Sequence, residues 1–158
     1  MTAVALDCEM VEVISNGSYK NAVARVSVVG GNLSVLLDEY VKPEQHVSDY
    51  RTSINGITAR DLANGKSVQE VKSKIMNIIH GKILVGHDLK PDLQALGVSH
   101  GNVRDTALKE EFMRRNNGQK PSLKDLARDL LGESIQVGTH DSVEDAKTAM
   151  KLYKKYPW

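Results

Sequence analysis

The stretch ALDCEMVEV, residues 5–13, places two acidic side chains inside an otherwise apolar run. Its apolar residues predict a β-strand that begins at the N-terminus and ends near Val11. Side chains alternate between the two faces of a strand, so Asp7 and Glu9 are expected to point to the same side. Cys8 points to the opposite side and is expected to lie in the core.

Two carboxylates on one side of a strand repel each other, and each raises the pKa of the other. A divalent cation would offset this repulsion, because hard cations prefer carboxylate oxygens as ligands. Alternatively, the strand end reaches solvent and water hydrates both acids. The residues of this stretch by themselves leave both interpretations open.

Composition limits the classes of protein that the chain can belong to. The chain has 158 residues, of which 41% are hydrophobic and 26% charged, and we predict a single domain over residues 1–158. A formal net charge of +1 argues against a strongly basic nucleic-acid-binding surface, but not against a site that binds one strand end. The only cysteine excludes an internal disulfide and favours a reducing compartment. We expect no membrane partner and no signal peptide, since the first apolar run contains two acids.

The rest of the chain alternates between strand and helix patterns. Residues 22–29 and 33–41 are predicted strands that join the first in an antiparallel meander. Residues 82–86 predict a buried strand parallel to the first, and residues 102–105 a fifth strand. The sequence therefore predicts the α/β class, with a mixed five-stranded sheet flanked by helices. The helices are expected over residues 67–80, 89–96, 107–115, 122–131 and 142–153, with a shorter one opened by a capping box at residues 58–61.

A second acidic stretch is LVGHDLKPD, residues 84–92, where an apolar strand leads into a helix. Asp88 and Asp92 are four residues apart and share one face of that helix. Either side chain could reach a site at the carboxyl edge of the sheet, where open α/β folds place their ligands. The local alternative is that Asp88 caps the helix and Asp92 enriches its first turn.

A third stretch is GTHDSVEDAKTAM, residues 138–150. His140 precedes the last helix in a glycine-containing loop, which suits an acid–base group, although a loop histidine is often simply exposed. Ser142 and Asp145 fit a capping box with Asp in place of Glu, so Asp145 could serve only as a cap.

Taken together, the order Asp-x-Glu, Asp, His-x-x-x-x-Asp resembles the DEDDh exonuclease family, which has a ribonuclease H-like fold. Further blocks resemble the Rex-type subgroup, which includes RNA exonuclease 4 and the interferon-stimulated exonuclease. The resemblance covers nearly the whole chain and departs at Asp141, where relatives carry a small or polar residue. The blocks that carry it include LDCEMV, DYRTSINGIT, KILVGHDLKPDLQAL, SLKDLARDLLG and HDSVEDAKTAMKLY.

The resemblance implies two Mg²⁺ or Mn²⁺ ions held by four carboxylates, and a histidine that acts as general base. It favours Asp92 over Asp88 as the third carboxylate. The implied metal ligands are Asp7, Glu9, Asp92 and Asp145, the implied base is His140, and the candidate substrate contacts are Met10, Arg51 and Asp88. For Met10, core packing is an equally good interpretation.

The expected function is that of a 3′-to-5′ exonuclease that binds the 3′ end of single-stranded RNA, or of DNA, and releases nucleoside 5′-monophosphates. The resemblance implies a nuclear location that includes the nucleolus, with the cytoplasm as the alternative. One rival is a catalytically inactive nucleic-acid-binding domain of the same fold. Another is an all-helical phosphohydrolase of the HD type, suggested by two His-Asp pairs, although the predicted strand before His87 argues against it.

Overall fold

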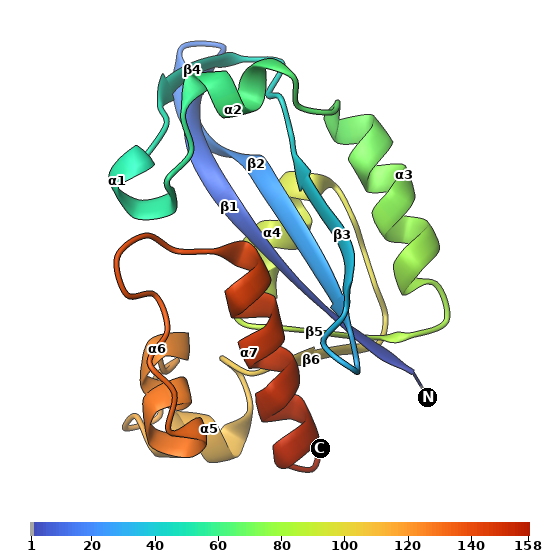
Figure 1. Ribbon diagram of the computed structural model, residues 1–158, viewed down its shortest axis with the longest axis vertical. Helices are drawn as coiled ribbons and strands as arrows, with labels where there is room; N and C mark the ends of the chain where they lie inside the picture. The colour runs from blue at the N-terminus through green and yellow to red at the C-terminus, as the bar shows by residue number, and fades with distance from the viewer. Residues whose placement is uncertain (1) are drawn as a thin grey trace.

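The computed structural model describes residues 2–158 as a mixed β-sheet packed between helices (Figure 1). The sheet has six strands in the order β3-β2-β1-β5-β6, and β4 pairs with β1 outside this path. The predicted fold class is confirmed, with one strand more than expected. The strands are β1 (Ala3–Ser15), β2 (Ser18–Gly30), β3 (Val35–Tyr40), β4 (His46–Asp49), β5 (Ile83–Gly86) and β6 (Val103–Asp105).

The first three strands form the predicted antiparallel meander, and β5 and β6 continue the sheet in parallel with β1. The unpredicted strand β4 is antiparallel to the far end of β1. The helices are α1 (Thr52–Asn55), α2 (Ala59–Ala63), α3 (Val68–Ile79), α4 (Leu89–Leu96), α5 (Glu110–Arg114), α6 (Leu123–Leu126) and α7 (Ser142–Lys155). A π-helical turn, η1 (Ala127–Leu131), continues α6, where the sequence predicted one uninterrupted helix.

The two faces of β1 pack against different helices. Leu6 and Cys8 lie in the core cluster that includes residues of α3 and α4. Ala5 lies on the opposite face and packs against α7 through Ala146 and Met150. Figure 1 shows α7 crossing this face of the sheet, while α3 lies on the other side. Asp7 and Glu9 continue the series that begins at Ala5, so they point toward the α7 side.

The sequence predicted the N-terminal cap of α2 correctly but not that of α4. The capping box of α2 is confirmed, because Asp61 N–H donates to the Thr58 hydroxyl and Asp61 accepts from Thr58 N–H. The prediction that Asp88 caps α4 is wrong, since its side chain makes no cap hydrogen bond. Asp105 at the end of β6 caps α4 instead, accepting the Asp88 and Leu89 N–H groups at 2.7 and 2.9 Å. No helix within residues 2–158 is long and apolar enough to cross a membrane.

The Asp105 carboxylate should therefore contribute strongly to stability. It is 8% exposed and also accepts the Ala107 N–H at 2.9 Å. We expect Asp105→Ala to lower the free energy of unfolding by about 3 kcal/mol, because it leaves buried N–H groups unpaired. Urea denaturation measures this loss. Asp129→Ala is the control, since its carboxylate pairs with Arg128 at the surface, and it should change stability little. Equal midpoints for the two variants would contradict the assignment of this cap.

Candidate active site: carboxylates beside the open edge of β1

One edge of β1 changes neighbours along its length. It pairs with β5 at residues 3–5 and with β4 at residues 12–14, and no described strand pairs with that edge in between. Two side chains bond the backbone there. Asp92 on α4 accepts the Cys8 N–H at 3.2 Å, and the Asn55 amide on α1 donates to the Met10 carbonyl at 3.1 Å. The interruption thus admits a carboxylate from α4 beside the Asp-x-Glu stretch.

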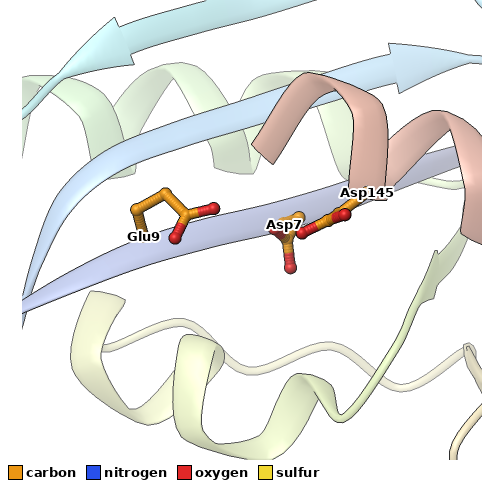
Figure 2. A group of neighbouring side chains, drawn as sticks. All are labelled: Asp7, Glu9 and Asp145. Atoms are coloured by element: carbon orange, nitrogen blue, oxygen red, sulfur yellow. The ribbon is translucent and has the colours of Figure 1, made fainter. Parts of the chain in front are cut away.

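Three carboxylates gather on the α7 side of β1. Asp7, Glu9 and Asp145 each offer one oxygen, and these atoms all lie within 4.8 Å of one another. Figure 2 shows the Asp145 carboxylate on α7 facing Asp7, with Glu9 farther along the same strand and turned toward the pair. Residues 138 positions apart in the chain are therefore neighbours because α7 packs across β1.

Burial and mutual repulsion raise the pKa values of these carboxyls. Burial raises the pKa of Asp7 well above its usual range, and the charges of Asp92, Asp145 and Glu9 raise it further. Burial raises the pKa of Glu9 to about 7, and the neighbouring Asp145 adds to this shift. Burial also raises the pKa of Asp92 to about 8, although its hydrogen bond from Cys8 N–H acts in the opposite direction. All four acids are therefore coupled in one electrostatic site.

Asp145 is held by a residue that the sequence reasoning did not select. The Gln136 amide donates toward both Asp145 oxygens at 3.2 Å, and the Gln136 N–H donates to Glu144 at 2.9 Å. Burial raises the pKa of Asp145 to about 6, while the Gln136 hydrogen bond lowers it. Gln136 has a φ of 56°, a left-handed backbone that no local sequence signal predicts for glutamine.

The predicted capping role of Ser142 and Asp145 is wrong. Asp141 is the N-cap of α7, and its carboxylate accepts from the Val143 and Glu144 N–H groups. Ser142 is buried and shares a 2.7 Å hydrogen bond with the Ser27 hydroxyl on β2. Asp145 is one turn into the helix, so its carboxylate is available to the cluster instead of to the helix end.

The donor set fits a divalent cation. Its atoms are carboxylate oxygens, which favour Mg²⁺ or Mn²⁺ over Zn²⁺. Arg25 stands opposite Glu9 in the sheet, but its guanidinium pairs with Asp38 at 2.9 Å and with Asp141 at 3.4 Å. The residues described here thus form no salt bridge to the clustered acids, although the Arg25 charge lowers the pKa of Glu9, and a bound cation would offset the remaining repulsion.

His140 lies in the loop that leads into α7, as expected. Its backbone N–H donates to the backbone carbonyl of Ile54 in α1 at 2.7 Å, which anchors this loop to α1. The side chain is partly exposed. The second His-Asp pair, at His87, follows β5 directly and its imidazole bonds Thr106 and the Pro121 carbonyl. A sheet protein with this arrangement is not an all-helical phosphohydrolase.

The three candidate substrate contacts lie on different elements: Met10 on β1, Arg51 before α1 and Asp88 before α4. Met10 packs partly against the core and lines a cavity of about 330 Å³ with Lys20, Asn21 and Pro91. The Arg51 guanidinium donates to Asn21 at 2.7 Å, which places it beside this cavity. Asp88 instead pairs with Lys120 at 3.0 Å, at the start of α4. The core packing considered for Met10 is therefore observed in part, and its contact with substrate stays a prediction.

The fold and the carboxylate cluster can now be compared with known proteins. A sequence profile described as Exonuclease (RNase_T) matches residues 4–153. The chain belongs to this exonuclease family. Dependence on divalent metal is a property of the family, and the acidic cluster is consistent with it.

Several relatives of the exonuclease are similar over almost all of this chain. RNA exonuclease 4 of Gibberella zeae is 44% identical over 155 residues, which cover 97% of this chain and 48% of that protein. RNA exonuclease 4 of Saccharomyces cerevisiae is 44% identical over 155 residues, covering 96% of this chain and 53% of that protein. This chain therefore spans about half the length of these two relatives.

Solved structures with the same fold are exonuclease modules of the DEDDh type. The catalytic unit of Neurospora crassa Pan2 is 34% identical with a TM-score of 0.83, over 98% of this chain and 27% of that one. The Pan2 module of Saccharomyces cerevisiae, solved in complex with AAUUAA RNA, is 32% identical with a TM-score of 0.81. That match covers 98% of this chain and 28% of that one.

The raised pKa values predict an unusual dependence of stability on pH in the metal-free exonuclease. The four acids have higher pKa values folded than unfolded, where they titrate near pH 4. Their contribution to stability is therefore fully present below about pH 4 and is lost as pH rises through about 6 to 8. We expect the free energy of unfolding in chelator to fall by on the order of a few kcal/mol between pH 5 and pH 8.5.

Thermal and urea denaturation across this pH range measure the effect. The Asp92→Asn variant should show a smaller fall, because one of the interacting acids no longer ionises. A metal-free protein that becomes more stable from pH 5 to pH 8.5 would contradict the electrostatic picture of the site.

Proposed function

We propose that this protein is a metal-dependent 3′-to-5′ exonuclease that degrades single-stranded RNA, with DNA as a further substrate, and releases nucleoside 5′-monophosphates. The observation that carries the proposal is the convergence of Asp7, Glu9 and Asp145, with Asp92 bonded beside them to the backbone of β1. The names of the RNA exonuclease 4 relatives and the RNA-bound Pan2 module support RNA as substrate.

In this proposal, Asp7, Glu9, Asp92 and Asp145 would hold two Mg²⁺ or Mn²⁺ ions. When bound, the metal offsets charge at the phosphate and makes a water molecule more acidic. The carboxylates hold and orient the ions, and their raised pKa values mean that binding displaces protons. Water then attacks phosphorus, the bond from phosphorus to the 3′ oxygen breaks, and that oxygen leaves with the electron pair and takes up a proton.

His140 is the proposed general base for the attacking water. Histidine is the side chain that most often acts as general base in enzymes. The loop that carries it is bonded to α1 through the His140 N–H, while its side chain stays partly exposed. The partial exposure of the side chain supports the proposal that it meets a substrate from solvent.

Substrate binding is proposed at a pocket for the terminal nucleotide next to the metal ligands. Met10 follows Glu9 directly, so it is available to pack on the terminal nucleotide. The planar guanidinium of Arg51 is suited to donate hydrogen bonds to sugar or phosphate oxygens. Asp88, which pairs with Lys120, is proposed to lie near the bound nucleic-acid strand. Because one nucleotide occupies such a pocket, we expect little sequence preference.

An assay with 3′- and 5′-labelled RNA tests the activity. We expect stepwise release of 5′-mononucleotides from the 3′ end that stops in chelator and resumes with Mg²⁺ or Mn²⁺. Asp7→Asn should reduce the rate at least about 10²-fold, because losing a metal ligand should cost at least as much as losing a general base. It should not lower the melting temperature in chelator at pH 8, since it relieves carboxylate repulsion.

Asp129→Asn provides the matched control, because it makes the same chemical change at an exposed acid that pairs with Arg128. A fully active Asp7→Asn enzyme would show that Asp7 is not part of the active site. If the protein binds the labelled RNA but releases no nucleotides under any metal condition, the alternative of an inactive nucleic-acid-binding domain is favoured instead.

A separate variant tests the general base. His140→Ala should lower kcat about 10²–10⁴-fold, the usual contribution of a positioned proton acceptor. The affinity for Mn²⁺, measured by calorimetry, should stay unchanged, because the four carboxylates remain in place. Val137→Ala is the control, because this side chain lies in the same loop and is exposed. Wild-type kcat in His140→Ala would exclude this histidine as the base.

A further inference from the structure

The short helix α1 is bonded both to β1, the strand of Asp7 and Glu9, and to the loop that carries His140. Figure 1 shows α1 beside the loop that leads into α7. On one side it bonds the backbone of β1 at Met10, directly after Glu9. On the other side its Ile54 carbonyl accepts the His140 N–H at 2.7 Å. The proposed metal ligands and the proposed base are therefore connected through one helix of four residues.

Asn55 makes the connection to β1. Its side chain is 6% exposed, and its amide nitrogen donates to the carbonyls of Met10 and Tyr50, both at 3.1 Å. Its amide oxygen accepts the Ile57 N–H at 2.8 Å. Both amide hydrogens and the oxygen are used, so the side chain has one orientation relative to the open edge of β1.

The contact between α1 and the His140 loop depends on the position of the helix. A helix of four residues has little stability of its own, so its place is set by tertiary contacts. Beyond the His140 hydrogen bond, the Thr139 side chain lies over Gly56, 3.6–3.8 Å from where a Cβ would stand. Movement of α1 away from β1 would therefore carry the backbone of His140 with it.

We propose that Asn55 is a positioning residue that sets the place of His140 relative to the carboxylates by holding α1 against β1. This inference rests on the proposed function, in which His140 is the general base. Asn55 does not touch the reacting atoms. Its effect reaches the reaction through the Ile54 carbonyl and the His140 N–H.

A double-mutant cycle tests the inference. We expect Asn55→Ala to lower kcat about 10- to 100-fold with little change in KM, because a small misplacement of a catalytic group has effects of this size. The same substitution in a His140→Ala background should lower kcat less than about 3-fold, since the group that it positions is already absent. Calorimetry should give an affinity for Mn²⁺ within about 3-fold of the wild type in both backgrounds.

Two further variants separate positioning from loss of stability. Gly56→Ala disturbs the same contact from the other side, since Gly56 has a φ of 73° that alanine adopts with strain, and it leaves the Asn55 side chain in place. It should behave as Asn55→Ala does in the cycle, and it decides the question if Asn55→Ala does not fold. Ser67→Ala removes the N-cap of α3 and should lower the melting temperature without lowering kcat.

The outcomes distinguish the inference from the proposed function. Equal losses of kcat in the wild-type and His140→Ala backgrounds would overturn the positioning role while leaving His140 as the base. A large loss of Mn²⁺ affinity in Asn55→Ala would also overturn it, because the residue would then act on the carboxylates. A fully active His140→Ala enzyme would overturn the assignment of the base and this inference with it.

Discussion

The edge of β1 on which the site depends has β5 beside residues 3–5 and β4 beside residues 12–14, so its backbone groups between them need partners other than a strand. Buried N–H and C=O groups are almost always paired, and here the partners are side chains. Asp92 accepts the Cys8 N–H, and Asn55 donates to the Met10 carbonyl. A strand that ran the full length of this edge would exclude both. The interruption of the sheet therefore makes room for the site.

The carboxylate cluster is formed by residues of β1 and α7. Asp7 and Glu9 point toward α7 because of strand alternation, and α7 brings Asp145 to meet them. Burial, and then the repulsion among these acids, raise their pKa values, and the nearby Arg25 pairs with Asp38 and Asp141. The folded chain thus holds acids that would be more stable with a cation between them. This electrostatic demand is consistent with the divalent-metal dependence of the family.

Much of the fold could be predicted from local patterns. The meander, the parallel strand β5 and helix α4 follow from hydrophobic periodicity and turn residues, which are short-range properties. Strand β4 and helix α1 were missed, because each has only four residues and neither carries a clear period. The cap of α4 was assigned to the wrong residue. Asp105 lies 16 and 17 positions from the N–H groups that it accepts, so no local capping rule could identify it.

The sequence by itself determined the α/β class and the side of β1 to which Asp7 and Glu9 point, because periodicity and alternation are properties of neighbouring residues. Together with the family resemblance, it also indicated which acids are candidate metal ligands and which histidine is the candidate general base. Only the tertiary structure decided which distant groups support them. Gln136 contacts Asp145 from a left-handed backbone, and Asn55 connects β1 to the helix that holds the His140 loop. These contacts depend on how α1 and α7 pack on the sheet, and packing between distant segments leaves no period in the chain.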